Sequence, residues 1–181
     1  MIHAVTTLVL GGARSGKSAL AEKLVRDSGL ERIYVATAEA GDGEMRERIA
    51  HHRERRGADW RTVEAPLQLA ETISREAGKG RIVLVDCLTL WLSNLMHADR
   101  DILRETSGLI EALQSAACPA VLVSNEVGLG LVPETPLGRK FRDEQGRLNQ
   151  RIAAAVPNVA FVAAGLPLWL KGKSHQGVSS Q

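Results

Sequence analysis

Short, continuous apolar runs alternate along this chain with longer stretches in which apolar residues recur every three or four positions. The continuous runs predict strands that are covered on both faces, at residues 4–10, 32–37, 81–86, 119–125 and 158–163. Two weaker runs predict a short strand at residues 59–64 and a short edge strand at residues 165–170. The periodic stretches predict helices, at residues 19–26, 42–56, 66–76, 88–96, 101–116 and 134–150.

The alternation of strand and helix predicts an α/β fold, a three-layer α/β/α domain with a mainly parallel sheet of about five core strands. With 181 residues, of which 44% are apolar, the chain is long enough for one sizeable core. We therefore expect one nucleotide-binding domain over residues 1–170. Residues 171–181 are polar and are expected to form a disordered tail.

Composition and charge limit the classes of binding partner and the cellular location that we expect. The net charge is +2 with scattered Lys and Arg, so we expect no nucleic acid partner. No apolar segment is long enough to span a membrane, and residues 1–4 lack the basic region of a signal peptide. Cys87 and Cys118 are flanked by apolar residues typical of a core, so neither a disulfide nor a zinc site is expected. These features favour a soluble, cytoplasmic protein.

One stretch between the first strand and the first helix matches the phosphate-binding pattern G-x-x-x-x-G-K-[ST]. It consists of Gly11, Gly12, Ala13, Arg14, Ser15, Gly16, Lys17 and Ser18. The glycines let backbone N–H groups surround phosphate oxygens, Lys17 supplies a charge for the outer phosphates, and the Ser18 hydroxyl can ligate Mg²⁺. The alternative is a glycine-rich turn that binds nothing. The strand–loop–helix context favours a P-loop NTPase fold.

Asp86 closes the apolar strand at residues 81–86, the usual form of a Walker B strand, whose carboxylate holds Mg²⁺ directly or through water. The alternative is that Asp86 caps the helix that starts at Leu88. The order of the two motifs along the chain favours the metal. The strand at residues 32–37 and the strand at 119–125 are both followed by loops at the edge where open α/β sheets bind ligands.

The predicted helix at residues 42–56 is unusually polar. One face carries Met45, Ile49, His52 and Arg56, at i, i+4, i+7 and i+11 spacing. His52 therefore points inward, whereas His51 is turned away by roughly a third of a circle. A neutral imidazole can attack phosphorus and form a phosphoramidate, and Arg53 and Arg56 could balance the phosphate charge. A structural or surface histidine is the alternative.

The stretch at residues 134–150 combines apolar positions at Leu137, Phe141 and Leu148 with a basic face, and it predicts one helix or a pair. The basic side chains are Arg139, Lys140, Arg142 and Arg147. Two interpretations stay open, a solvated helix or a surface that binds phosphate or a neighbouring subunit.

Several segments together resemble the bifunctional adenosylcobinamide kinase/adenosylcobinamide-phosphate guanylyltransferase family of cobalamin biosynthesis. The resemblance runs from Leu8 to about Gly172. Besides residues 11–18, it rests on Tyr-Val-Ala-Thr-Ala at 34–38, Glu-Met-x-x-Arg-Ile-x-x-His-Arg-x-x-Arg at 44–56, Trp-Arg-Thr-Val-Glu at 60–64, Asp-Cys-Leu-Thr at 86–89, Ser-Asn-Glu-Val-Gly at 124–128 and Gly-Arg-Leu-Asn-Gln at 146–150. The combination is far more specific than the phosphate loop alone.

The resemblance implies two reactions at one nucleotide site. A γ-phosphoryl group passes from ATP or GTP to the hydroxyl of adenosylcobinamide. A histidine then attacks the α-phosphorus of GTP, and the guanylyl-histidine passes GMP to adenosylcobinamide phosphate, which gives adenosylcobinamide-GDP. The resemblance also implies a homo-oligomer, with a trimer as the expected form and the corrinoid near a subunit boundary.

The family's functional residues carry over onto matching positions of this chain. His52 matches the nucleophile, because it precedes the Arg-x-x-Arg formed by Arg53 and Arg56. The nucleotide contacts fall on residues 11–18, Ala36, Thr37, Ala38, Arg53, Glu54, Arg55, Arg56, Glu64 and Asp86. Two other functions compete with this assignment: a P-loop kinase for a small hydroxyl substrate with no covalent step, and a nucleotide-binding regulatory module without turnover.

Overall fold

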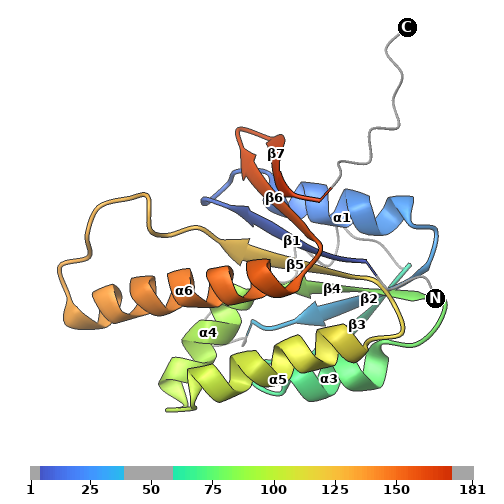
Figure 1. The fold of residues 1–181 in the computed structure, drawn as a ribbon, viewed down its shortest axis with the longest axis horizontal. Helices are drawn as coiled ribbons and strands as arrows, with labels where there is room; N and C mark the ends of the chain where they lie inside the picture. Colours follow the sequence, from blue (N-terminus) through green and yellow to red (C-terminus); the bar gives the residue numbers. More distant parts are fainter. Residues whose placement is uncertain (1–4, 39–58, 173–181) are drawn as a thin grey trace, which may run out of the picture.

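The computed structural model describes residues 5–38 and 59–172 of the chain (Figure 1). Its strands are β1 (Thr6–Gly11), β2 (Glu31–Ala36), β3 (Trp60–Glu64), β4 (Arg81–Asp86), β5 (Ala120–Asn125), β6 (Asn158–Ala163) and β7 (Leu166–Lys171). They form one seven-stranded sheet in the order β3-β2-β4-β5-β1-β6-β7. Every neighbouring pair is parallel except β6 and β7. The predicted mainly parallel sheet is confirmed, and so is the edge strand near residues 165–170.

The described helices are α1 (Lys17–Asp27), α3 (Leu69–Glu76), α4 (Leu88–His97), α5 (Ile102–Ser115) and α6 (Pro136–Ala155). Figure 1 shows α1 on one face of the sheet and the other four helices on the opposite face. This arrangement confirms the predicted α/β/α layers. The predicted helix at residues 42–56 lies outside the described residues, as does most of the predicted tail, whose first residue Lys171 ends β7.

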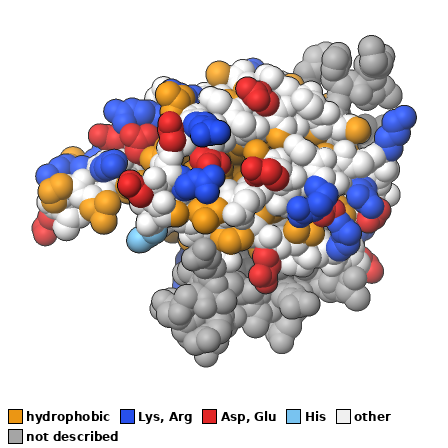
Figure 2. All heavy atoms as spheres, turned by 90° about the horizontal axis from the view of Figure 1, so that it is seen from below, with side chains coloured by type: hydrophobic (Ala, Val, Ile, Leu, Met, Phe, Trp, Pro, Cys, Tyr) orange, Lys and Arg blue, Asp and Glu red, His pale blue; other side chains and the backbone are white. Residues whose placement is uncertain are grey.

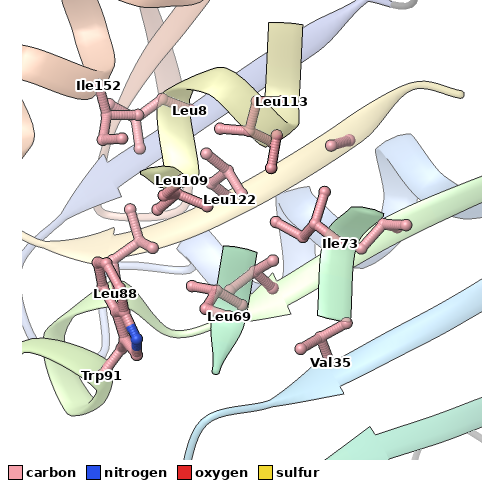
Figure 3. Packing of buried hydrophobic residues seen from close by; sticks show 14 of the residues in the cluster. Leu8, Val35, Leu69, Ile73, Leu88, Trp91, Leu109, Leu113, Leu122 and Ile152 are labelled. Carbon is pink, nitrogen blue, oxygen red and sulfur yellow. The ribbon is translucent and has the colours of Figure 1, made fainter. Parts of the chain in front are cut away.

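Two apolar clusters cover the two faces of the sheet. The larger cluster lies under α3, α4, α5 and α6; Figure 3 labels Leu8, Val35, Leu69, Ile73, Leu88, Trp91, Leu109, Leu113, Leu122 and Ile152 in it. The smaller cluster lies under α1 and includes Val9, Ala21, Val25, Val121 and Val123. Successive residues of β5 thus enter opposite clusters, because side chains alternate across a strand. Burial on both faces explains the unbroken apolar runs of the sequence.

One predicted helix start is wrong. The sequence predicts a helix over residues 66–76 that starts at Pro66, but α3 begins at Leu69. The carbonyl oxygens of Pro66 and Leu67 accept hydrogen bonds from side chains of α4 instead, at 3.0 Å from Asn94 Nδ2 and at 2.9 Å from Trp91 Nε1. Because these carbonyls face α4, the first turn of a helix cannot form around Pro66.

The segment at residues 134–150 forms a single helix, which continues to Ala155. Leu148 is buried and Phe141 packs against the large cluster, as expected. Leu137, however, is 65% exposed. The reason is that the N-terminal part of α6 extends beyond the sheet (Figure 1). Periodicity alone could not show where the sheet stops.

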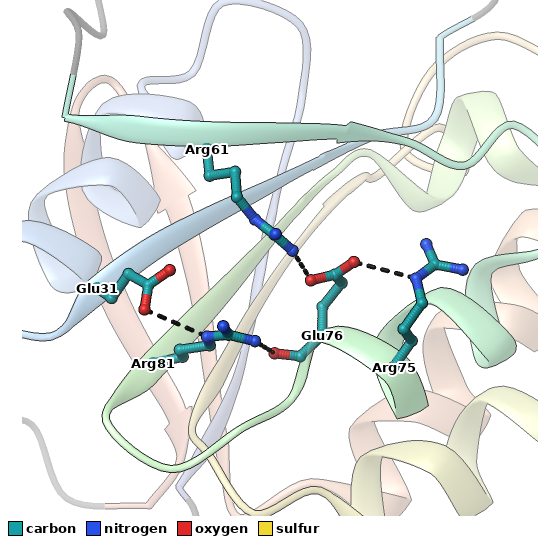
Figure 4. Close-up of polar contacts among 5 residues, drawn as sticks. All are labelled: Glu31, Arg61, Arg75, Glu76 and Arg81. Carbon is teal, nitrogen blue, oxygen red and sulfur yellow. Dashed lines mark hydrogen bonds and ion pairs between the residues drawn. The ribbon is translucent and has the colours of Figure 1, made fainter.

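Charged groups at the amino ends of the strands pair with one another (Figure 4). Glu76, at the end of α3, has a buried side chain that forms ion pairs with Arg61 of β3 and with Arg75. Arg81, at the start of β4, forms an ion pair with Glu31 at 3.2 Å and donates to the carbonyl oxygen of Glu76 at 3.4 Å. This group links three strands and one helix at the edge of the sheet opposite the phosphate loop.

The outer face over α3 and α5 carries Lys and Arg interspersed with Asp and Glu (Figure 2). No basic stripe runs across that face. Within residues 5–38 and 59–172, the structure holds no helix with the length and apolar character needed to cross a bilayer. Cys87 and Cys118 are both buried and unpaired by a disulfide, as the sequence predicted.

Candidate active site

The predicted phosphate loop forms a tight turn between β1 and α1, and its backbone geometry requires glycine at two positions. A Cβ on Gly11 would lie 2.5 Å from Ser15 Oγ and 2.6 Å from the carbonyl oxygen of Val162. Gly16 has a φ of +98° and directly precedes α1. Left-handed backbone of this kind favours glycine and turns successive N–H groups toward one concavity, which suits an anion.

The turn between β6 and β7 supports the loop from outside. The backbone N–H of Gly165 donates to the carbonyl oxygen of Ser15 at 2.8 Å. Ser15 also carries a buried hydroxyl that has no hydrogen-bond partner in the described part of the chain. A buried polar atom without a partner is uncommon in proteins, and it is consistent with a site that a polar ligand completes.

Lys17 is the central charge of the loop. Only 9% of the residue is exposed, and its Nζ donates to the carbonyl oxygen of Gly12 at 3.0 Å. Burial lowers the pKa of Lys17 below its ordinary value, against smaller opposing effects of Cys87 and Asp86. An ammonium has three donors, so the bond to Gly12 leaves others for phosphate oxygens. A desolvated cation without a carboxylate partner gains strongly from an anionic ligand.

The ends of the parallel strands bring predicted nucleotide contacts into one row. Ala36 pairs with Glu64 of β3 on one side and with Asp86 of β4 on the other. Ala65, directly after Glu64, donates its N–H to the carbonyl oxygen of Ala36 at 2.8 Å. Glu64 is exposed, whereas Asp86 is half-buried. The two acids therefore flank Ala36 at the same edge of the sheet as the phosphate loop.

Asp86 does not cap α4. The residue that precedes this helix is Cys87, which has no side-chain capping bond, so the capping interpretation is wrong. One carboxylate oxygen of Asp86 accepts a hydrogen bond from the Tyr34 hydroxyl at 3.0 Å. Tyr34 is 6% exposed and packs edge-on against Trp60, with ring centroids 6.3 Å apart. A buried aromatic side chain thus fixes the orientation of the carboxylate.

Thr37 has a buried position at this edge. Its hydroxyl donates to the carbonyl oxygen of Cys87 at 2.7 Å and accepts from the N–H of Cys87 at 2.8 Å. Asn94 donates to the carbonyl oxygen of Thr37 at 2.7 Å. The Thr37 side chain therefore ties β2 to the start of α4. The Thr37 N–H donates to the carbonyl oxygen of Asp86 at 3.3 Å, so the contact of this residue with nucleotide stays a prediction.

The thiol of Cys87 lies beside this site but has the properties of a core residue. Burial raises the pKa of Cys87 to about 11, and Asp86 adds to the effect. The thiol therefore keeps its proton at neutral pH, and a protonated, buried thiol is a poor nucleophile.

The donor atoms at this edge fit a magnesium ion bound together with a nucleotide. No cluster of three His, Cys, Asp or Glu side chains that could hold a metal occurs in the described ranges. Nucleotide-bound Mg²⁺ does not need one, because it takes one or two protein oxygens and completes its shell with phosphates and waters. Ser18 lies in the first turn of α1, which packs against β4, the strand that ends in Asp86. A hydroxyl and a carboxylate are the donor set that P-loop enzymes use.

Comparisons with known proteins place this geometry in a family. The family described as cobinamide kinase / cobinamide phosphate guanyltransferase matches residues 7–170. The chain belongs to this family. It is 55% identical over 168 residues to the bifunctional adenosylcobalamin biosynthesis protein CobP of Pseudomonas aeruginosa, across 92% of this chain and 97% of that protein. It is 42% identical over 179 residues to the bifunctional adenosylcobalamin biosynthesis protein CobU of Escherichia coli, across 91% and 98% of the two chains.

A solved structure supports the fold. The flagellar accessory protein FlaH from Methanocaldococcus jannaschii is similar in structure, with a TM-score of 0.54 and 10% sequence identity. The match covers 94% of this chain and 79% of that chain. At this identity the likeness concerns the fold alone. The predicted P-loop NTPase fold and the resemblance to the cobinamide kinase / guanyltransferase family are thus confirmed.

The other predicted site residues divide into two groups. The phosphate loop, Ala36, Thr37, Ala38, Glu64 and Asp86 all lie at the carboxyl edge of the sheet. His52, Arg53, Glu54, Arg55 and Arg56 lie outside the described residues, so their functions in this family member stay predictions.

The basic side chains of α6 bind chiefly to their own chain. Arg139 donates to the carbonyl oxygens of Pro133 and Glu134, at 3.1 and 2.6 Å, and Arg142 donates to that of Gly128 at 2.8 Å. Arg147 forms an ion pair with Glu144 at 2.6 Å. These contacts favour the interpretation of a solvated helix over that of a phosphate-binding surface.

Sequence reasoning missed the side chains that support the site. Tyr34 orients Asp86, Gly165 supports the loop, and polar residues of α4 and α6 hold the end of β5. The only sequence feature that pointed to these supporting residues was that Tyr34 and the end of β5 belong to segments typical of the family. Nothing in the spacing showed which of their side chains meet.

Proposed function

We propose that this protein carries out both reactions of its family at the carboxyl edge of the sheet, with one nucleotide cradle serving both. As a member of the family it is a transferase, a bifunctional cobinamide kinase and cobinamide phosphate guanylyltransferase of adenosylcobalamin biosynthesis. The observation that carries the single-site proposal is the buried Lys17 ammonium inside the phosphate loop, at the edge where Asp86 ends β4.

In the kinase reaction, the cradle holds the triphosphate of ATP or GTP. The hydroxyl oxygen of adenosylcobinamide forms a bond to the γ-phosphorus, while the bond between the γ-phosphorus and the bridging oxygen breaks. The products are the nucleoside diphosphate, adenosylcobinamide phosphate and a proton. Lys17 and the loop N–H groups neutralise the phosphate charge, which is the main catalytic requirement of phosphoryl transfer.

In the guanylyltransferase reaction, an imidazole nitrogen of His52 attacks the α-phosphorus of GTP, and pyrophosphate leaves. A phosphate oxygen of adenosylcobinamide phosphate then attacks the same phosphorus and displaces the histidine, which gives adenosylcobinamide-GDP. Covalent catalysis of this kind divides one displacement into two. Arg53 and Arg56 balance the charge around the transferred group.

Ser18 and Asp86 hold Mg²⁺, which supplies positive charge at the phosphates when it is bound. Tyr34 keeps the Asp86 carboxylate in a fixed orientation, in the manner of groups that surround metal ligands. The corrinoid substrates bind near a boundary between subunits of a homo-oligomer, with a trimer as the expected form, and the enzyme works in the cytoplasm.

Labelling separates this proposal from its rivals. Protein is incubated with α-labelled GTP and Mg²⁺, and the expected result is an acid-labile, alkali-stable label on the wild type. The label should be absent from His52→Ala and retained by His51→Ala, the matched control one position away. His52→Ala should keep kinase activity with adenosylcobinamide.

Each rival predicts a different result. No label on the wild type together with phosphorylation of adenosylcobinamide identifies a kinase without a covalent step. Nucleotide binding without either reaction identifies a regulatory module. A label that survives in His52→Ala but not in His51→Ala assigns the nucleophile to the neighbouring histidine.

A further inference from the structure

The last residue of β5 lies between the phosphate loop and the acid of β4. In the sheet, β5 separates β1, which leads into the loop, from β4, which ends in Asp86. Gly11 pairs in register with Asn125, and the N–H of Glu126 donates to the carbonyl oxygen of Gly11 at 3.0 Å. Asp86 pairs with Val123, two residues before Asn125. Asn125 therefore extends beyond the level of Asp86, alongside the start of the cradle.

The side chain of Asn125 faces the same side of the sheet as Lys17 and Asp86. Ser124 bonds to α6 on the opposite face, and side chains alternate along a strand. Val123 and Val121, at the alternate positions of β5, pack in the cluster under α1, the helix that begins with Lys17. Tyr34 belongs to that same cluster and reaches Asp86 from it. Three polar groups thus converge on one face at one edge.

A network of buried and half-buried side chains holds the backbone of Asn125 on both sides. Its N–H donates to Thr89 Oγ1 of α4 at 2.8 Å, and its carbonyl oxygen accepts from Asn149 Nδ2 of α6 at 3.0 Å. Asn149 Oδ1 accepts in turn from Ser124 at 2.7 Å and from Gln145 at 3.0 Å. Ser124 and Gln145 are fully buried.

Such a network is costly to desolvate, and its effect is to fix the peptide of one residue. The Asn125 side chain, by contrast, is half-buried and forms no hydrogen bond with any residue in the described ranges. A rigidly held backbone that presents an uncommitted amide is typical of a group that contacts a ligand.

We propose that the side-chain amide of Asn125 donates a hydrogen bond to an oxygen of the γ-phosphoryl group of the bound nucleotide. This inference rests on the proposed nucleotide site. Charge on the γ-phosphoryl oxygens must be stabilised while the group is transferred, and a preorganised neutral donor does so without adding a charge that would hold the product. Asn125 is thereby a catalytic residue of the kinase reaction. In guanylylation the breaking bond lies at the α-phosphorus, so the same contact matters less.

Calorimetric binding tests the contact directly. Wild type, Asn125→Ala and Asn125→Asp are titrated with GDP and with the non-hydrolysable β,γ-imido analogue of GTP, in the presence of Mg²⁺. Asn125→Ala should bind the triphosphate analogue about 10- to 100-fold more weakly, since one hydrogen bond to a charged group is lost. Its affinity for GDP should stay within about 2-fold of the wild type, because no contact to the β-phosphate is removed. Asn125→Asp should lose more triphosphate affinity through like-charge repulsion.

Activities and a matched variant complete the test. The kinase kcat of Asn125→Ala should fall by about 10²-fold, with a smaller loss in the histidine-labelling rate. Asn158→Ala alters an asparagine at the start of β6. Its kinase kcat and its histidine-labelling rate should both equal those of the wild type. The variants keep the backbone bonds of residue 125, so thermal unfolding should change little.

Two results overturn the inference: unchanged affinity of Asn125→Ala for both nucleotides, or an equal loss of affinity for both. Failure of the wild type to bind either nucleotide is a different result. It rejects the nucleotide site itself, and the Asn125 contact with it.

Discussion

The two edges of the sheet place charged groups in opposite ways. At the amino edge, the buried Glu76 is paired with Arg61 and Arg75, and Arg81 is paired with Glu31 (Figure 4). At the carboxyl edge, Lys17 bonds to a carbonyl oxygen and Asp86 to a tyrosine hydroxyl. No ion pair joins Lys17 to Asp86, both of which the structure describes. Charges at one edge neutralise each other, whereas those at the other are oriented by neutral groups.

Whether a charged side chain is paired within the chain indicates its role, in stability or in ligand binding, more clearly than its residue type does. The charges at the amino edge are already paired within the chain, so we expect this edge to contribute chiefly to stability. A buried ammonium and a carboxylate held apart keep their capacity for phosphate and metal, at some cost in desolvation. The comparison predicts that changes at the carboxyl edge affect activity and changes at the amino edge affect folding.

The largest expected effect is that of Lys17→Ala. Removing the ammonium should lower both the kinase rate and the rate of histidine guanylylation by about 10²- to 10³-fold, because both use the same cradle. The free energy of unfolding should change by no more than about 1 kcal/mol, since the lysine makes one bond to a carbonyl and is unfavourably desolvated. Activity assays and urea unfolding measure the two quantities.

The control for this change is Lys23→Ala in the same helix, where the exposed lysine pairs with Asp27. It should leave both rates unaltered. If Lys17→Ala removed only one of the two activities, the single cradle would have to be replaced by two nucleotide sites.

A smaller effect of the opposite kind is expected from Glu76→Gln. The neutral amide cannot form the ion pairs with Arg61 and Arg75, so the free energy of unfolding should fall by about 1–3 kcal/mol. Rates per folded molecule should remain those of the wild type, because Glu76 lies at the far edge from the cradle. Glu31→Gln, which alters a carboxylate that is 53% exposed, should cost less stability. A fall in kcat of folded Glu76→Gln would contradict the separation of the two edges.

The sequence predicted the carboxyl edge because parallel strands all end there. Apolar runs located β1, β2 and β4, and the residues that follow such runs meet at one edge whatever the detailed packing. The row formed by Ala36, Glu64 and Asp86 is therefore a consequence of topology. The family resemblance added the prediction of which of these residues bind nucleotide.

The supporting contacts were not predictable from the sequence. The bonds from Asn149 to Asn125 and from Gly165 to Ser15 join residues far apart in the chain, and no periodic pattern marks them. The start of α3 was misplaced for a similar reason, since Asn94 and Trp91 of a later helix hold the carbonyls near Pro66. Polar contacts between elements depend on how the elements pack, which local propensity does not encode.

The smallest effect, and the sharpest test of the carboxyl edge, is expected from Tyr34→Phe. The substitution removes the hydroxyl that donates to Asp86 and leaves the ring in place. Loss of a group that orients a metal ligand should raise the Mg²⁺ concentration needed for half-maximal nucleotide binding by about 10-fold. The free energy of unfolding should fall by about 1 kcal/mol.

Trp60→Phe, which alters the ring that packs edge-on against Tyr34, is the control for packing alone. If both variants shifted the Mg²⁺ dependence equally, packing rather than the hydroxyl would orient Asp86; if neither did, Asp86 would not be the carboxylate that serves the metal.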